Sequence, residues 1–304
     1  MQKNRFITPY GISQPPLKAV LKWKLSTLFF KKEKVADDDF RLPVHFLDKK
    51  DLKQEEDFIL WLGHASFYIQ IDGIKILTDP IFYNLPFIPR LSAMPIDPLD
   101  LQPDLILVSH GHYDHLDLKS LEVLKIYEKN IPIIMPLQLS QYLKKSANTK
   151  ELNWYEKYQY KDLTITALPA SHWHRRGMYD FNKALWCSFA LTYKNKHIFF
   201  AGDTAFDTHF EEIRQKFGTI DLALMPIGAY KPIEVMKPSH MNPKEAIQAT
   251  KILNAKKMIP YHYGTFKLSD EPIGEPHSWI SKLQNHEKQT IKILDVGEIY
   301  KRYL

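Results

Sequence analysis

The stretch Ser109-His110-Gly111-His112-Tyr113-Asp114-His115 is the most informative part of this 304-residue chain. It follows Leu105–Val108, a short apolar run that predicts a buried strand. Three imidazoles and a carboxylate within six residues would therefore lie at the carboxyl end of a strand, where open α/β sheets place their ligands. Nitrogen and oxygen donors held this close can bind two divalent cations, and zinc prefers such donors. A chance run of surface histidines is the alternative, and the H-x-H-x-D-H spacing argues against it.

Three further candidate ligands repeat this arrangement, because each stands just past an apolar run that predicts a strand. They are His172 after Leu163–Leu168, Asp203 after His197–Ala201, and His262 after Met258–Pro260. Taken singly, each would be read as a satisfied histidine or a turn aspartate. Taken together, they stand where a metal cluster shared by one sheet edge requires them. His174, two residues after His172, is a competing ligand that spacing alone does not exclude.

The rest of the pattern predicts a single α/β domain, residues 51–304, preceded by a basic N-terminal arm, residues 1–50. Asp72-Gly73 is a hairpin signal between two apolar runs. Asp117 and Asn242 are predicted N-caps of two helices, one ending near Tyr127 and the other near Leu253. The remaining predicted strands are Phe58–Leu62, Ser66–Ile71, Ile74–Leu77 and Leu222–Ile227.

The net charge of +6 is concentrated at the N-terminus. Residues 1–34 hold eight Lys and Arg and one acid, a net of +7, while the other 270 residues hold 33 bases and 34 acids, a net of −1. Apolar residues recur there at helical spacing beside Lys18 and Lys22, namely Leu17, Val20, Leu21, Leu25 and Leu28. Two interpretations stay open: a basic amphipathic helix that lies on an anionic membrane surface, or an arm packed on the domain.

The motifs resemble those of the metallo-β-lactamase superfamily and, within it, of the N-acyl-phosphatidylethanolamine-hydrolysing phospholipases D and their bacterial relatives. The likeness runs in matching order from about residue 58 to 270. The stretches that carry it are Trp61–Ala65, Leu77–Phe82, His110–Asp117, His172-Trp173, Asn182-Lys183, Leu185-Trp186, Phe199–Thr204, Pro226–Tyr230, Met236-Lys237 with His240 and Pro243, and His262 with Gly264–Phe266. The resemblance implies a four-layer αββα sandwich with a dinuclear metal site at one edge of the sheets.

The resemblance also implies a ligand set. It assigns His110, His112 and His172 to one metal, Asp114, His115 and His262 to the other, and Asp203 to a bridge between them. Zn²⁺ is the expected cation, and Mn²⁺ or Fe²⁺ would accept the same ligands. Two departures stand out: Gly111 replaces a larger polar residue of the animal enzymes, and His174 falls where those enzymes have no histidine. The N-terminal arm does not match at motif level.

Two cations a few ångströms apart would lower the pKa of a water held between them and neutralise charge on a phosphodiester as this water attacks phosphorus. The expected catalytic residues are Asp114, which would orient the nucleophile, Asp203, and His240, which would contact the phosphate or protonate the leaving oxygen. The alternative for His240 is positioning of the helix that begins near Pro243. His64 has two open interpretations, a partner that orients a metal ligand or a satisfied buried histidine, and Asp79 is expected to be structural or to orient a ligand and not to be catalytic.

The stretch Ile81–Leu91 contains two prolines and an asparagine, which argue against a regular element, yet six of its residues are large and apolar. Loops normally lie on the surface, so an exposed apolar patch is expected here. Two interpretations stay open, contact with acyl chains or a bilayer and burial in a homodimer interface. The residues concerned are Phe82, Tyr83, Leu85, Phe87 and Ile88.

These patterns together favour a metal-dependent phosphodiesterase that hydrolyses a phospholipid and releases phosphatidic acid. The alternative is a metallo-hydrolase of the same superfamily acting on a lactone or a small cyclic phosphodiester. A nuclease is less favoured, and no nucleic-acid partner is expected, because the body of the chain lacks a basic excess. The chain has a single cysteine, Cys187, and shows no signal-peptide pattern and no 18-residue apolar run. These features predict a cytoplasmic protein that is not secreted. The basic arm predicts that it associates peripherally with the membrane.

Overall fold

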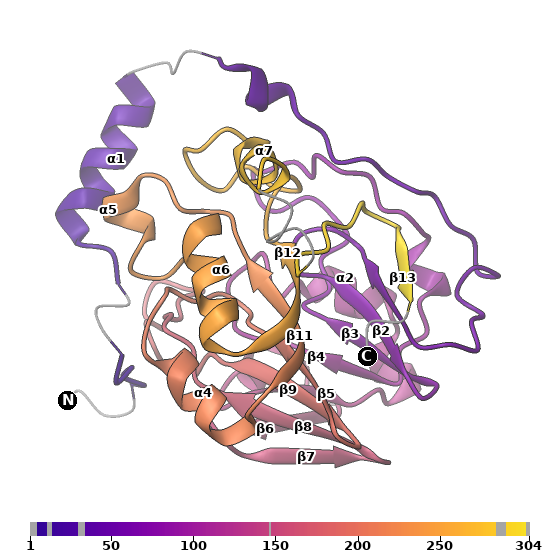
Figure 1. The fold of residues 1–304 in the computed structure, drawn as a ribbon. Helices are drawn as coiled ribbons and strands as arrows, with labels where there is room; N and C mark the ends of the chain where they lie inside the picture. Colours follow the sequence, from indigo (N-terminus) through magenta and orange to yellow (C-terminus); the bar gives the residue numbers. More distant parts are fainter. Residues whose placement is uncertain (1–4, 11–13, 30–33, 146, 284–289, 302–304) are drawn as a thin grey trace.

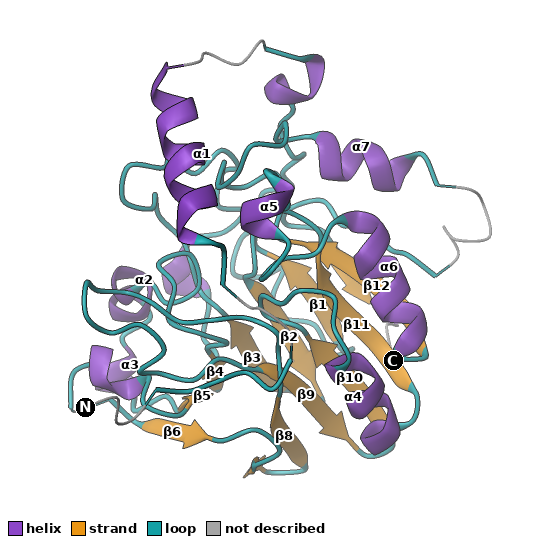
Figure 2. Cartoon of the chain, turned by 90° about the vertical axis from the view of Figure 1, so that its left-hand side faces the viewer, coloured by secondary structure: helices purple, strands orange, loops and turns teal. Residues whose placement is uncertain are grey.

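Two β-sheets packed face to face, with helices on both outer faces, form the body of the protein (Figure 1; Figure 2). The structure is a computed structural model that describes residues 5–10, 14–29, 34–145, 147–283 and 290–301. Viewed as in Figure 2, α2 and α3 lie on one side of the sheets, and α4 and α6 lie on the other. This is the predicted four-layer αββα sandwich.

The first sheet has the strand order β13-β1-β2-β3-β4-β5-β6. Its strands are antiparallel from β13 to β3 and parallel from β3 to β6. The bounds are β1 Phe58–Trp61, β2 Phe67–Ile71, β3 Ile74–Thr78, β4 Leu105–Leu107, β5 Ile133–Pro136, β6 Thr149–Leu152 and β13 Ile299–Lys301.

The second sheet has the order β12-β11-β10-β9-β8-β7. The β12-β11-β10 part is parallel, and the β10-β9-β8-β7 part is antiparallel. The bounds are β7 Lys157–Tyr160, β8 Leu163–Leu168, β9 Ser188–Tyr193, β10 Lys196–Phe200, β11 Ile220–Pro226 and β12 Ala255–Tyr261.

Seven α-helices and three short 3₁₀ turns are formed by the described residues. The α-helices are α1 Leu17–Phe29, α2 Leu118–Val123, α3 Ile126–Lys129, α4 His209–Phe217, α5 Ile233–Met236, α6 Pro243–Ile252 and α7 Glu275–Ser281, and the 3₁₀ turns are Ala36–Asp39, Pro98–Asp100 and Ser140–Tyr142. Among these residues no helix combines the length and the apolarity that a membrane crossing requires.

The alternation of side chains along β1 explains why the sheets are buried on both faces. Ile59 and Trp61 belong to the core between the two sheets, while Phe58 and Leu60 pack with Leu121 of α2 in the core on the other side of the sheet. Successive strand residues point to opposite faces of the sheet, so a strand that is apolar throughout must pack against another layer on each face. The second sheet packs on one face of β1, and helix α2 packs on the other.

Several local predictions are confirmed. Asp72 and Gly73 both adopt positive φ angles, 49° and 72°, in the tight turn between β2 and β3. Asp117 caps α2 by accepting hydrogen bonds from the backbone N–H groups of Lys119 and Ser120. Asn242 and Glu245 form a capping box at the start of α6.

The single helix predicted from Leu118 to Tyr127 is wrong, because the chain forms two short helices there. Lys125 adopts a left-handed conformation with φ of 54° and separates α2 from α3. The break lets Leu124 and Ile126, which lie on either side of it, both be buried in the core beneath the first sheet. Packing has overridden local helix propensity here.

Segments of the predicted arm contact the domain at several points. Phe6 pairs with Asn182 through backbone hydrogen bonding, and the Tyr10 hydroxyl donates to Glu212 at 2.9 Å. Val44 bridges to Val296, and Leu42 is buried in the main core. Between these anchored segments α1 lies beside α5, at one end of the sandwich (Figure 1; Figure 2).

Candidate metal centre

The strands that precede the candidate ligands all end at one edge of the sandwich. In the first sheet β1, β3 and β4 run in the same direction, and in the second sheet β8, β10 and β12 do so. The loops after these strands carry the polar residues: His64 after β1, Asp79 after β3, His110 to His115 after β4, His172 after β8, Asp203 after β10 and His262 after β12. The histidines and aspartates named here meet in one cluster, except Asp79, which contacts the cluster through His115.

The first group in the cluster consists of His110, His112 and His172. The Nδ1 atom of His112 lies 3.0 Å from Nε2 of His110 and 3.1 Å from Nε2 of His172. The three nitrogens therefore converge on one point. A tetrahedral zinc site with Zn–N bonds near 2.05 Å has ligand-to-ligand edges of about 3.3 Å, so this spacing fits one cation.

The second group consists of Asp114, His115, Asp203 and His262. The Nε2 atom of His115 lies 3.2 Å from Asp203 Oδ2 and 3.5 Å from Asp114 Oδ2. The Nε2 atom of His262 lies 3.1 Å from Asp203 Oδ1 and 3.6 Å from Asp114 Oδ2. Asp203 also lies 4.0 Å from His110 Nε2, so its carboxylate reaches both groups. This geometry suits the predicted bridge, and the assignment of each ligand to a cation stays a prediction.

Hydrogen bonds from behind fix which nitrogen each histidine turns to the centre. Asp79 is buried and accepts hydrogen bonds from Nδ1 of His115 at 2.6 Å and from the Ser109 hydroxyl at 2.5 Å. That hydroxyl oxygen is 3.0 Å from Nδ1 of His110, and the Ser239 carbonyl oxygen is 3.0 Å from Nδ1 of His172. Because these Nδ1 atoms donate outward, the three Nε2 lone pairs face the cluster, as metal binding requires.

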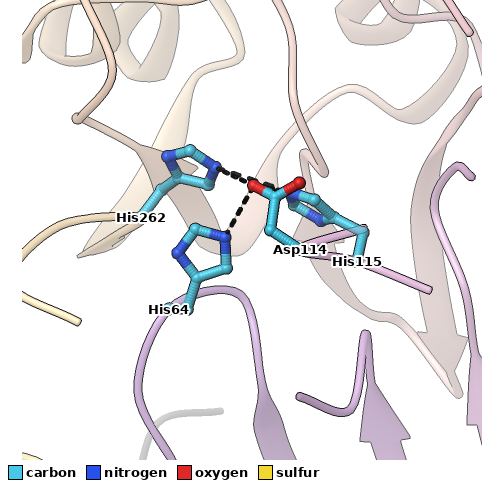
Figure 3. A group of neighbouring side chains, drawn as sticks. All are labelled: His64, Asp114, His115 and His262. Atoms are coloured by element: carbon cyan, nitrogen blue, oxygen red, sulfur yellow. Dashed lines mark hydrogen bonds and ion pairs between the residues drawn. The ribbon is translucent and has the colours of Figure 1, made fainter. Parts of the chain in front are cut away.

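His64 contacts the cluster through a carboxylate. Figure 3 shows its ring beside Asp114 and His262, with Nε2 of His64 3.1 Å from Asp114 Oδ2. The backbone of His64 is held in a left-handed turn, where its N–H donates to the Thr265 hydroxyl at 2.8 Å. His64 is therefore oriented to hold the Asp114 carboxylate, which agrees with the first of its two interpretations.

The electrostatics of the cluster favour bound cations. Burial alone would raise the pKa of Asp114 and Asp203, but the neighbouring histidines outweigh it and hold both values well below the usual range. Burial alone would lower the pKa of His115 and His262, yet the two carboxylates raise both, that of His262 to about 9. Two ionised carboxylates buried among imidazoles need positive charge nearby, which protons or metal ions supply.

His240 follows α5 and joins the cluster from the cavity side. Its Nδ1 atom lies 3.7 Å from Asp203 Oδ2, and burial lowers its pKa to about 4. His174, the competing ligand, does not join the cluster. Its Nε2 atom instead lies 2.9 Å from the Tyr142 hydroxyl oxygen.

A cavity of about 560 Å³ opens onto the cluster. His112, Asp114, Asp203 and His240 lie at one end of it, and apolar side chains make up most of the wall. These apolar residues come from four parts of the chain and are Leu17, Val20 and Trp23 of α1, Val235 and Met236 of α5, Trp173 and Phe181 of the segment after β8, and Leu268. Sequence reasoning identified the cluster and missed this wall, since no local pattern joins segments so distant in sequence.

The stretch Ile81–Leu91 differs from the expected exposed patch. Phe82 and Leu85 are buried, so the expectation that they contact lipid is wrong. Leu85 packs with Ile81 and Phe266, because an irregular segment with large apolar residues has folded them inward. Phe87 alone of the five candidates is fully exposed, at a φ of 64°. Tyr83 and Ile88 are half-buried, and Lys119 Nζ lies 3.9 Å from the Tyr83 ring centroid.

The sequence pattern of the Beta-lactamase superfamily domain matches residues 75–263, more than half of the chain. The chain belongs to the metallo-β-lactamase superfamily. A metal-dependent hydrolase from Methanopyrus kandleri is 28% identical to it, covering 80% of this chain and 99% of that protein. Igni18, a solved metallo hydrolase from Ignicoccus hospitalis, superposes with a TM-score of 0.63 at 22% identity, covering 80% of this chain and 97% of that one, and shows the same fold.

Two curated relatives carry the name N-acyl-phosphatidylethanolamine-hydrolyzing phospholipase D. The Caenorhabditis elegans protein is 34% identical over 287 residues, which cover 86% of this chain and 81% of the relative. The mitochondrial protein of Saccharomyces cerevisiae is 40% identical over 239 residues, which cover 73% of this chain and 51% of the relative, so this chain spans about half the length of the yeast protein. Within the superfamily, the chain is thus a metal-dependent hydrolase similar to these phospholipases.

Proposed function

We propose that the protein hydrolyses N-acyl-phosphatidylethanolamine or a similar phospholipid by a phospholipase D reaction and releases phosphatidic acid. The observation that carries this proposal is the cavity, which joins the cluster of histidines and aspartates to an apolar wall built partly by α1. An amphiphile with a phosphodiester between its head group and its acyl chains matches that division. The similarity to the two curated phospholipases supports the same substrate class.

Two divalent cations held by the seven ligands would activate a water and offset negative charge on the phosphoryl oxygens. The chain's own residues would position the substrate. Asp114 lines the cavity and is held by His64, so its carboxylate is oriented to accept a proton from the attacking water. His240 lines the same end of the cavity and is placed to hydrogen-bond a phosphoryl or leaving oxygen. Lys24 and Arg175 add positive charge to the wall, which suits an anionic substrate.

The outward face of α1 supports an anionic membrane as the partner. Leu21 and Leu25 lie one turn apart and are 53% and 54% exposed. Lys18 and Lys22 are exposed beside them. Leucines on such a face can enter the interface of a bilayer while lysines bind acidic head groups. The same helix forms part of the cavity wall, so a lipid would have a short path from bilayer to cluster.

The test is hydrolysis of vesicles containing N-acyl-phosphatidylethanolamine, run beside bis(p-nitrophenyl) phosphate and a lactone with the metal-loaded protein. We expect phosphatidic acid and N-acylethanolamine from the vesicles, loss of this activity with a chelator, and none from Asp114→Ala. Intact vesicles beside turnover of the lactone or the soluble diester would contradict the phospholipase proposal and favour the alternative hydrolase.

A further inference from the structure

His174 lies outside the cluster, yet its imidazole is buried against one of the candidate ligands. The ring is fully buried and nearly parallel to that of His112, with an interplanar angle of 11° and a centroid separation of 6.3 Å. The backbone of His174 is held in place by Asn182, whose side-chain oxygen accepts its N–H at 2.9 Å. A buried polar ring in such a position needs hydrogen-bonding partners.

The Nε2 side of the His174 ring has such hydrogen-bonding partners. Tyr142 donates its hydroxyl proton to Asp180 at 2.7 Å. The Tyr142 oxygen can then only accept at its 2.9 Å contact with Nε2 of His174, so the histidine proton is on Nε2. Asp180 is fixed in turn by the backbone N–H groups of Arg176 and Gly177. This leaves a lone pair on Nδ1 of the neutral His174 ring.

The Nδ1 side of the His174 ring lacks such partners among the described residues. Within the described part of the chain, Nδ1 of His174 is buried and has no hydrogen-bond partner. The same holds for Nε2 of His112. When Nδ1 of His112 binds a cation together with His110 and His172, whose Nε2 atoms lie 3.0 Å and 3.1 Å away, the proton of the neutral His112 ring is on Nε2. Two neighbouring parallel rings thus present one unused buried donor and one unused buried acceptor.

Gly111 makes room for His174. A Cβ atom on Gly111 would lie 2.2 Å from Cε1 and 2.7 Å from Nδ1 of His174, and 2.7 Å from the movable Cδ1 of Leu139. The φ angle of Gly111 is not in the left-handed region, so a side chain is excluded by the His174 ring and not by backbone strain. The two departures noted in the sequence, Gly111 and His174, are therefore one steric pair.

We propose that His174 is a positioning residue for the metal centre, and that one buried water joins its Nδ1 to the Nε2–H of His112. The water would satisfy both nitrogens and hold His112 in the tautomer whose Nδ1 faces the cation. The Tyr142–Asp180 pair would hold His174 in the matching tautomer. This proposal rests on the metal-binding part of the proposed function and is independent of the phospholipid substrate.

The experiment measures Zn²⁺ affinity by competition with a chromophoric chelator, and Co²⁺ absorption spectra, for the full-length protein and its variants. We expect His174→Ala to weaken binding of one cation about 10- to 100-fold and to alter the Co²⁺ spectrum. Tyr142→Phe should shift both readouts in the same direction by a smaller factor. His197→Ala, which removes a half-buried histidine at the far end of β10, is the control and should bind both cations like the parent. Parent-like affinity and spectrum in both His174→Ala and Tyr142→Phe would overturn the proposal.

A double-variant cycle tests the steric pair. Gly111→Ala alone should lower Tm and metal affinity, whereas Gly111→Ala in the His174→Ala background should cost much less. Equal losses in both backgrounds would show that His174 does not occupy the space beside Gly111. These binding readouts use no substrate. If the variants show the expected shifts in metal affinity but the parent protein does not hydrolyse the vesicles, only the phospholipase proposal is contradicted.

Discussion

Hydrogen bonds to individual ligands orient the cluster, and Asp79 is the strongest example. This carboxylate accepts from the backbone N–H and the hydroxyl of Ser109 and from Nδ1 of His115, all in a fully buried position. An amide at this site would turn an NH₂ group toward one of these donors. We predict that Asp79→Asn weakens Zn²⁺ binding roughly 10- to 100-fold and lowers the free energy of unfolding by about 1–3 kcal/mol.

Chelator competition and denaturant unfolding measure these two effects. Asp221→Asn is the matched control, because Asp221 also accepts from a backbone N–H, that of His197, and pairs with Lys256, away from the cluster. It should lose stability and keep its metal affinity. Loss of stability without loss of affinity in Asp79→Asn would mean that Asp79 supports the fold alone.

At the scale of elements, α1 has two faces with different predicted roles. Val20 and Trp23 line the cavity, while Leu21 and Leu25 are exposed. We predict that Leu21→Glu/Leu25→Glu weakens binding to anionic vesicles about tenfold or more, because each buried leucine contributes roughly 1 kcal/mol or more at an interface. Turnover of the soluble diester should stay within about twofold. Co-sedimentation with vesicles measures the first effect.

The control for that prediction is Phe46→Glu/Leu99→Glu, which adds the same charge at two exposed apolar residues outside α1. It should bind vesicles like the parent. Equal weakening by both pairs would assign the effect to net charge and not to the leucine face.

The inward face of α1 leads to a separate prediction. Trp23 lines the cavity, and within the described chain its buried indole N–H has no hydrogen-bond partner. We expect Trp23→Ala to raise KM for the phospholipid several-fold and to change kcat/KM for bis(p-nitrophenyl) phosphate little, because the small diester has no acyl chain to pack against the apolar wall that Trp23 helps to form. A larger effect on the small diester would place Trp23 at the reacting end of the cavity.

The whole molecule brings the ligands together from both sheets, and this explains what could be predicted from sequence. His110, His172, Asp203 and His262 each follow a strand whose apolar run is visible in the sequence, and the edge they share follows from strand direction. The cavity wall was not predictable in this way, because Trp23 and Phe181 come from irregular or distant segments that only tertiary packing brings together. The burial of Phe82 and Leu85 depends on the same packing.

Because the cluster spans both sheets, cations should stabilise the whole fold. Ligands that bind only the folded state stabilise it by about 4 kcal/mol at a thousand-fold excess over Kd, which corresponds to roughly 6 °C in Tm for a protein of this size. We predict that added chelator lowers Tm by that order, as measured by calorimetry. Asp203→Ala, which lacks the carboxylate that reaches both groups, should respond much less. An unchanged Tm in the parent would contradict a cation cluster that links the sheets.

The most direct test of the phospholipase D proposal is the fate of the water oxygen. Vesicles of N-acyl-phosphatidylethanolamine are hydrolysed by the metal-loaded protein in ¹⁸O-labelled water, and both products are analysed by mass spectrometry. Attack at phosphorus predicts one ¹⁸O atom in the phosphate of phosphatidic acid and none in the N-acylethanolamine. Label in the N-acylethanolamine, release of free fatty acid instead of phosphatidic acid, or vesicles left intact by the metal-loaded protein would contradict the phospholipase D proposal.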